Sequence, residues 1–272
     1  MEKERVRNKK TRIPEIDFLR GAALLLMVWH HVMYDVRYIF HVNAFAFQDS
    51  YWFYVIGRSV VIALFLIVSG ISTRFSANNL MRGRRMVIFS AFATVLTTVL
   101  YLIDSQMGII FFNVIHVIAL STLFYAVIEH LLIVRHRKST NGSVDMEKQR
   151  AKFIGFLITF GTLVVVIGHV ILPILPDETR NPLFIILGSS VTGVSSLDQM
   201  PFLPHFGYYL LGAAIGQTLY ESGEPLWKSE KGWFFSFGRP IRFMGRNALL
   251  VYVLHQPIIL AILWALSKIG LI

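Results

Sequence analysis

The chain of 272 residues contains no cysteine. This absence excludes a disulfide framework, a thiolate nucleophile, a zinc–thiolate site and the covalent attachment of a c-type haem. Charged residues are also scarce, at 15% of the sequence, whereas soluble domains carry roughly a quarter. Any chemistry must therefore rely on histidine, carboxylates, arginine or a bound cosubstrate.

Apolar residues make up 55% of the chain and gather in long runs. A bilayer core takes about 20 apolar residues as a helix, and helices satisfy their own backbone hydrogen bonds in lipid. The sequence therefore predicts an all-α, polytopic membrane bundle in a single domain over residues 1–272. The predicted spans are 17–40, 51–73, 86–104, 107–134, 153–175, 201–221 and 244–267. The short apolar segment 183–194, bracketed by Pro182 and Gly193, is a possible eighth helix or a re-entrant turn.

The net charge is +10, and the basic residues recur on every second connection. They lie in the amino-terminal tail 1–14, after the second span, between Arg135 and Lys152, and before the seventh span. Because Lys and Arg favour the cytoplasmic side, this pattern places the amino terminus inside and the carboxyl terminus outside. The same pattern of basic residues explains the net positive charge, so no nucleic-acid partner is needed to account for it. Basic residues at the membrane surface also indicate contacts with membrane lipid.

Ionisable residues inside a span are costly and therefore point to function. In the first span, Arg20 lies near the inner end and His31 lies about 16 Å farther out. Asp35 is one turn beyond His31 and shares its helix face, so its carboxylate is expected to orient the imidazole as a general base. The glycines at 70 and 212, in small-residue contexts, predict close helix packing instead.

Other polar side chains fall at a similar predicted depth. With His31 and Asp35 they predict a polar chamber open to the outside, where a donor such as His255 or Arg58 stabilises an oxyanion. A lone membrane histidine such as His169 is more often an interhelical hydrogen-bond partner. The candidates for the chamber are Arg58, His116, His205, His255 and Gln256, with Asp104 and Asp198 at its outer edge.

Five blocks of the sequence, in order, resemble the heparan-α-glucosaminide N-acetyltransferase catalytic-domain family, and by this resemblance the chain is expected in a bacterial cytoplasmic membrane. The blocks are Glu15–Asp35, Leu64–Ser72, Asn113–Leu120, Pro201–Gly212 and Gly245–Pro257. The spacing of Arg20 and His31 also resembles the first helix of the acyltransferase-3 family. The chain lacks the large lumenal region of the human lysosomal family member, so the resemblance predicts the type of reaction and leaves the acceptor open.

The resemblance implies that acetyl-coenzyme A, or another short acyl-CoA, is the donor on the cytoplasmic side. The acceptor is then a hydroxyl or amine of a glycan or small polar molecule on the outer side. His31, Asp35, His255, His116 and Arg58 are the candidate catalytic residues, and no metal is predicted. The candidate ligands of the coenzyme A phosphates are Arg20, Arg82, Arg84, Arg85, Arg239, Arg242 and Arg246.

Two other interpretations of the same residues stay open. His31, Asp35 and Arg58 could form the relay of a transporter or proton-coupled channel. Histidines on four spans could also ligate haem in axial pairs. A homo-oligomer is compatible with all three interpretations.

Overall fold

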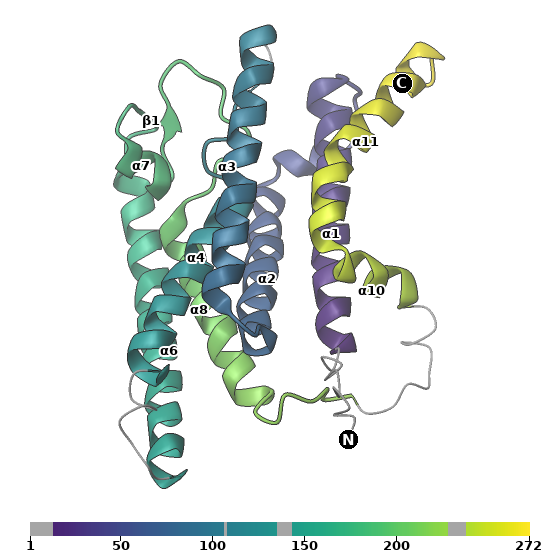
Figure 1. The fold of residues 1–272 in the computed structure, drawn as a ribbon. Helices are drawn as coiled ribbons and strands as arrows, with labels where there is room; N and C mark the ends of the chain where they lie inside the picture. The colour runs from purple at the N-terminus through teal and green to yellow at the C-terminus, as the bar shows by residue number, and fades with distance from the viewer. Residues whose placement is uncertain (1–12, 106–107, 135–142, 228–237) are drawn as a thin grey trace, which may run out of the picture. The chain divides into compact units, whose positions relative to one another are not determined.

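The computed structural model describes residues 13–105, 108–134, 143–227 and 238–272. Helices dominate these residues (Figure 1), which confirms the predicted all-α membrane bundle. The chain forms two compact units: Met1–Ile62 with Leu219–Ile272, and Ala63–Thr218. The single domain over residues 1–272 stays a prediction, and residues 1–12 of the predicted basic tail lie outside the described residues.

The first unit is built on two long helices, α1 and α11. Its elements are α1 (Pro14–Tyr34), the π-helix η1 (Asp35–Ile39), the 3-10 helix η2 (Ala46–Asp49), the π-helix η3 (Trp52–Gly57), α10 (Arg239–Arg246) and α11 (Ala248–Lys268). Both α10 and α11 pack against α1 (Figure 1). The predicted seventh span, 244–267, is thus two helices, which are separated at Asn247, where the backbone leaves the helical conformation.

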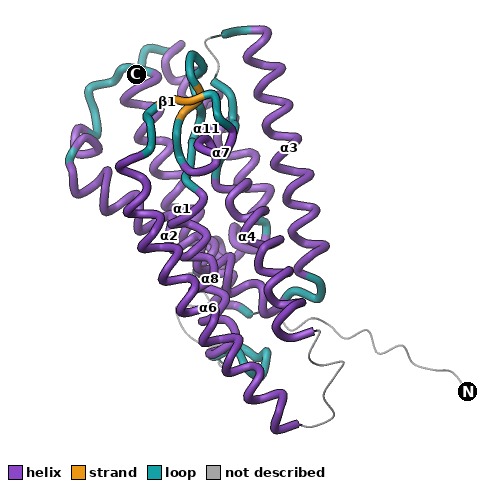
Figure 2. Tube along the Cα trace, turned by 90° about the vertical axis from the view of Figure 1, so that its left-hand side faces the viewer, coloured by secondary structure: helices purple, strands orange, loops and turns teal. Residues whose placement is uncertain are grey.

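The second unit contains most of the remaining helices. Its elements are α2 (Arg58–Ile71, whose first turn belongs to the first unit), η4 (Ser72–Phe75), α3 (Asn79–Ile103), α4 (Val114–Glu129), η5 (His130–Val134), α6 (Ser143–Ile171), η6 (Leu172–Ile174), β1 (Glu178–Thr179), α7 (Pro182–Leu187), β2 (Ser190–Val191) and α8 (Phe202–Leu219). The two strands pair in parallel around α7 (Figure 2). With six residues, α7 spans about 9 Å and is too short to cross a bilayer.

Six helices of the described residues are long and apolar enough to cross a membrane. They are Pro14–Ile39, Trp52–Phe75, Asn79–Ile103, Val114–Ile133, Met146–Ile174 and Ala248–Lys268. The remaining predicted span corresponds to α8, which has 18 residues but a more polar composition. Most of its side chains are buried, because α8 contacts other helices of its unit on several sides. A helix surrounded by protein needs fewer lipid-facing apolar residues, which explains its lower hydropathy.

Small residues let α8 approach its neighbours, as predicted for Gly70 and Gly212. A Cβ added at Gly70 would lie 2.1 Å from the carbonyl oxygen of Tyr209, and one at Gly212 would lie 2.1 Å from that of Ile67. Such separations are far below van der Waals contact. The backbones of α2 and α8 therefore touch directly, and the packing role predicted for both glycines is confirmed.

Several boundaries differ from the predicted ones. Helix α3 begins at Asn79 and α6 at Ser143, several residues before the apolar runs begin. Arg82, Arg84 and Arg85 were predicted in a connection but lie in the first turns of α3. The reason is that a membrane helix continues beyond the hydrocarbon core into the headgroup region, where basic side chains are solvated.

The fourth span was predicted from residue 107 but begins at Val114. The side chain of Asn113 accepts a hydrogen bond from the backbone N–H of Ile115 and forms a capping box with His116. Before this cap, Ile109 is extended and pairs with Ser196. Apolar content alone gave no signal for this boundary, whereas the asparagine cap is the physical reason for it.

Candidate functional site

The imidazoles of His31 and His255 lie against each other in the first unit. His31 belongs to α1 and His255 to α11, and their ring centroids are 4.9 Å apart. The packing of α1 against α11 thus brings together two residues separated by more than 200 positions in the sequence. Both rings are partly buried. The structure therefore joins two of the five predicted catalytic residues.

The hydrogen bonding of His255 determines which of its ring nitrogens carries the proton and which can accept one. Its Nδ1 lies 2.5 Å from the carbonyl oxygen of Tyr252. A carbonyl oxygen only accepts, so Nδ1 carries the proton and, in the neutral ring, Nε2 presents a lone pair. This Nε2 is buried, and none of the described residues forms a hydrogen bond with it. A neutral histidine with an unpaired, buried acceptor nitrogen has the arrangement of a general base.

Asp35 has a different partner from the one predicted. The side chain is 1% exposed, and its Oδ2 accepts a hydrogen bond of 2.9 Å from Nε2 of Gln256. In the described part of the chain, no hydrogen bond joins Asp35 to His31, which corrects the predicted orientation of His31 by this carboxylate. The physical reason is that Gln256, from the neighbouring α11, reaches the carboxylate directly.

Within the part of the chain that the structure describes, three buried polar atoms of this cluster have no hydrogen-bond partner: Oδ1 of Asp35, Oε1 of Gln256 and Nε2 of His255. Each costs several kcal/mol when left unpaired inside a membrane. All three are acceptors in the neutral state of His255 and the ionised state of Asp35. The cluster therefore suits a ligand that donates hydrogen bonds, such as the O–H or N–H of an acceptor molecule.

His30 and Arg58 flank this cluster within the same unit. The His30 ring lies 5.9 Å from the rings of both His31 and Phe53. The guanidinium of Arg58 lies over the ring of Tyr54, at 5.8 Å from its centroid. Oxyanion stabilisation by Arg58 stays a prediction.

At the amino-terminal end of α1, two predicted coenzyme A ligands share one carboxylate. Asp17 accepts from Nη1 of Arg20 at 3.4 Å and from Nε of Arg246 at 3.2 Å. Arg20 also donates to the carbonyl oxygen of Gly245 at 3.2 Å. These contacts link α1 to α10, so both arginines have a structural role in addition to the predicted one.

The remaining predicted coenzyme A ligands differ in exposure. Arg239 is exposed on α10, whereas Arg242 is only 7% exposed. In the second unit, Arg82 donates to the carbonyl oxygen of Ser69 at 3.4 Å, and Arg84 and Arg85 are exposed on α3. Their binding of coenzyme A stays a prediction.

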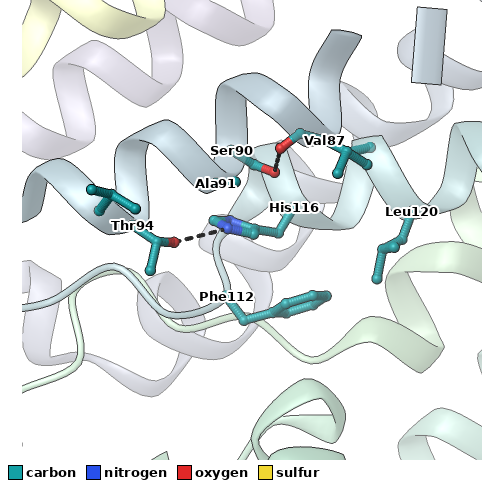
Figure 3. A pocket seen from close by; sticks show the side chains of 9 residues that line it. Val87, Ser90, Ala91, Thr94, Phe112, His116 and Leu120 are labelled. Carbon is teal, nitrogen blue, oxygen red and sulfur yellow. Dashed lines mark hydrogen bonds between the residues drawn. The ribbon is translucent and has the colours of Figure 1, made fainter. Parts of the chain in front are cut away.

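His116 belongs to the second unit, and both of its ring nitrogens are engaged. Nδ1 lies 2.9 Å from Oδ1 of Asn113, and Nε2 lies 3.1 Å from Oγ1 of Thr94 (Figure 3). The ring borders a largely apolar pocket of about 380 Å³ between α3 and α4, together with side chains such as Phe112 and Leu120. His116 therefore caps α4 and joins it to α3. That His116 shares a chamber with His31 and His255 stays a prediction.

The second unit also contains a buried polar network that the sequence analysis did not identify. Glu129 accepts from Nδ2 of Asn79 at 3.0 Å and from the hydroxyl of Tyr125 at 3.4 Å. Gln217 donates to the same hydroxyl at 3.1 Å, and Thr122 bonds Tyr209 at 2.8 Å. The signal was present in α4, where polar residues recur at 121, 122, 125 and 129, on one helical face.

Comparison with known proteins adds one finding to this geometry. A family model described as heparan-alpha-glucosaminide N-acetyltransferase, catalytic, matches residues 12–138 and 150–257. The chain belongs to this family. The match to the N-acetyltransferase family includes both His31 and the His255–Gln256 pair. No curated protein and no solved structure matches the chain. In the described residues, no group of three or more His, Asp and Glu side chains is placed to hold a metal ion.

Proposed function

We propose that the protein transfers an acetyl or other short acyl group from cytoplasmic acyl-coenzyme A to a hydroxyl or amine on the other side of the membrane, as a bacterial cytoplasmic-membrane enzyme. Its membership of the N-acetyltransferase family supports the type of reaction. The observation that carries the proposal is the contact of the partly buried rings of His31 and His255, together with the buried Nε2 of His255, which has no hydrogen-bond partner among the described residues. This arrangement supplies a base inside a helical membrane protein.

In the proposed reaction, Nε2 of His255 takes the proton from the acceptor O–H or N–H. The acceptor oxygen or nitrogen then forms a bond to the thioester carbonyl carbon, and the developing oxyanion requires a donor, for which His31 and Arg58 are the candidates. When the C–S bond breaks, the imidazolium returns its proton to the departing sulfur. The products are the acylated acceptor and free coenzyme A thiol. Asp35 and Gln256 accept hydrogen bonds from the acceptor and hold its orientation.

The first test is acetyl transfer by the purified full-length protein in lipid nanodiscs. Acetyl-coenzyme A labelled in the acetyl group is supplied with a mixture of sugars and amines, and both free thiol and labelled products are measured. We expect thiol release that is matched by label on an acceptor. Thiol release at the rate of empty nanodiscs, together with an absence of acetyl-coenzyme A binding by calorimetry, would contradict the proposal. Transport of an unmodified substrate would instead support the transporter interpretation.

A second prediction concerns the charge of Asp17. Its carboxylate pairs with Arg20 and Arg246, and it competes with any phosphate for them. We expect Asp17→Asn to tighten the binding of adenosine 3′,5′-bisphosphate by about threefold at low salt, since exposed ion pairs are individually weak. The gain should shrink at high ionic strength because salt screens these charges.

The control is Glu224→Gln, which makes the same change of charge at an exposed position of the same unit. It should leave the affinity for adenosine 3′,5′-bisphosphate as in the unmodified protein. Equal affinities for the Asp17 and Glu224 variants would assign Arg20 and Arg246 to the packing of α10 alone.

A further inference from the structure

The segment between η1 and η3 contains a single buried residue, and that residue is polar. Gln48, in η2, is 4% exposed, whereas every other residue of 40–51 is exposed or half-buried. Its Nε2 is buried, and no described residue accepts a hydrogen bond from this amide. A buried donor without a partner is destabilising, since it has given up its hydrogen bonds to water. Such a group in a folded protein therefore requires an explanation.

Contacts on both sides of Gln48 hold this segment against α1 and η1. The ring of Phe45 lies 6.1 Å from that of Trp29 on α1. The carboxylate of Asp49 accepts a hydrogen bond from the guanidinium of Arg37 on η1. The residues that α1 and η1 contribute to the candidate cluster lie between these two contact points along the chain. Gln48 therefore belongs to the segment that packs on this part of the helix.

Ring contacts lead from the same segment to the candidate catalytic histidines. Phe47, which precedes Gln48, has its ring 5.1 Å from that of Phe53. Phe53 lies 5.9 Å from the ring of His30, and His30 lies 5.9 Å from that of His31. All of these residues belong to the first unit. Continuous side-chain contacts thus connect the segment that buries Gln48 to the pair of histidines that includes the proposed base.

The backbone on the amino-terminal side of Gln48 is held in an unfavourable conformation. His41 and Phe45 have φ angles of 54° and 57°, in the left-handed region that residues other than glycine rarely adopt. Strain of this kind persists where the surrounding structure enforces it, and it occurs often at functional sites. The segment therefore combines two destabilising features, the strain and the unpaired amide, which is typical of a site that is fixed before its ligand arrives.

The hydrogen-bonding character of Gln48 complements that of the candidate cluster. The cluster's unpaired atoms, on Asp35, Gln256 and His255, are acceptors, whereas Nε2 of Gln48 is a donor. The proposed reaction needs a donor for the oxyanion that forms on the thioester carbonyl. A buried side-chain amide is suited to this task, because water does not compete for its N–H. Arg58, in contrast, is partly exposed.

We infer that Nε2 of Gln48 donates a hydrogen bond to the carbonyl oxygen of the acyl thioester, and that this bond strengthens as the oxyanion forms. The inference rests on the proposed function and adds a residue that the sequence analysis did not identify. Gln48 keeps both of its amide protons throughout. The proton transfers at the base and at the departing sulfur are therefore unchanged.

Gln48→Met is the test variant, because methionine has nearly the size of glutamine but no amide. Gln217→Met is the matched control, since Gln217 lies on α8 and its Nε2 already donates to the hydroxyl of Tyr125 at 3.1 Å. The first measurement is the thermal unfolding midpoint of the full-length protein in nanodiscs without ligand. We expect Gln48→Met to raise the midpoint by about 2 °C, because an unpaired amide is removed, and Gln217→Met to lower it by a similar amount.

The second measurement is NMR of bound acetyl-coenzyme A that carries ¹³C at the thioester carbonyl, with no acceptor present. A hydrogen bond to the carbonyl oxygen moves this resonance downfield from its position in free acetyl-coenzyme A. We expect the downfield shift for the unmodified protein and for Gln217→Met, and its loss in Gln48→Met.

The third measurement is the rate of acetyl transfer. The kcat of Gln48→Met should fall about 10²- to 10³-fold, the range for loss of one oxyanion donor, while KM changes little. Gln217→Met should keep the rate of the unmodified protein. A loss of turnover together with a higher unfolding midpoint separates the role of Gln48 from a general effect on folding.

Three results would overturn the inference: a downfield shift that persists in Gln48→Met, equal turnover of the two methionine variants, or a lower midpoint for Gln48→Met, which would mean that its amide is already paired. The same measurements separate this inference from the proposed function. If the unmodified protein shifts the carbonyl resonance but transfers no acetyl group, the proposed function is wrong and the contact with Gln48 stands. If the unmodified protein does not bind acetyl-coenzyme A, both are wrong.

Discussion

Gly245→Ala is expected to disrupt the packing of α10 against α1. A Cβ at Gly245 would lie 1.8 Å from the carbonyl oxygen of Asp17, and a Cβ at Gly21 would lie 1.8 Å from that of Ile241. Both obstacles are backbone atoms, which cannot rotate away as a side chain can. The two helices must therefore separate to admit even one methyl group. We expect the free energy of unfolding to fall by about 3 kcal/mol, at the upper end for overpacked sites.

The measurement is the thermal unfolding midpoint in detergent or nanodiscs, and Gly155→Ala is the control. Gly155 lies within α6, and a Cβ there would have no atom within 4 Å. Since alanine favours helix over glycine by about 1 kcal/mol, this variant should keep or raise the midpoint. An unchanged midpoint for Gly245→Ala would show that α10 does not pack on α1 at this distance.

A further consequence of this packing concerns the arginines nearby. Arg20 donates to the carbonyl oxygen of Gly245, and Arg246 pairs with Asp17. Separation of the helices would lengthen both contacts. A fall in the affinity for coenzyme A in Gly245→Ala, alongside the loss of stability, would therefore connect the geometry of α10 to donor binding.

The sequence allowed the membrane bundle to be predicted because hydropathy depends on composition, which needs no knowledge of neighbours. It predicted close helix packing at Gly70 and Gly212 for a related reason: glycines have no side chain, so they mark close approach whichever helix is the partner. The structure adds that these two glycines pack α2 against α8. The α1–α10 contact follows the same rule. It was not predicted, because the sequence around Gly21 and Gly245 does not show which helix approaches each of them.

The partners of polar side chains were harder to predict. The spacing of His31 and Asp35 places them on one helix face, but it contains no information about which helix lies opposite. That helix is α11, and its Gln256 bonds to Asp35. For the same reason, the network around Glu129 was not predicted, since its members come from α3, α4 and α8. Tertiary contacts decide these pairings.

His255→Ala is expected to lower the rate of acyl transfer by about 10² to 10⁴, the range for removal of a general base. Its Nδ1 donates to the carbonyl oxygen of Tyr252, which leaves Nε2 as the acceptor. Alanine removes the base but leaves α1 packed on α11 through the surrounding apolar residues. Binding of acetyl-coenzyme A, measured by calorimetry, should therefore stay unchanged while turnover falls.

His169→Ala is the matched control for this substitution. His169 also bonds a carbonyl oxygen through Nδ1, that of Val165 at 2.8 Å, but its side chain is exposed on α6. Full turnover in this variant would show that loss of a membrane histidine is not harmful in itself. The decisive comparison is with His31→Ala. His31 contacts the ring of His255, but among the described residues only His255 of this pair has a hydrogen bond that fixes its tautomer. The His31→Ala variant should therefore retain more activity than His255→Ala. If His31→Ala is inactive and His255→Ala keeps most of its rate, then His31 is the base and His255 only supports it.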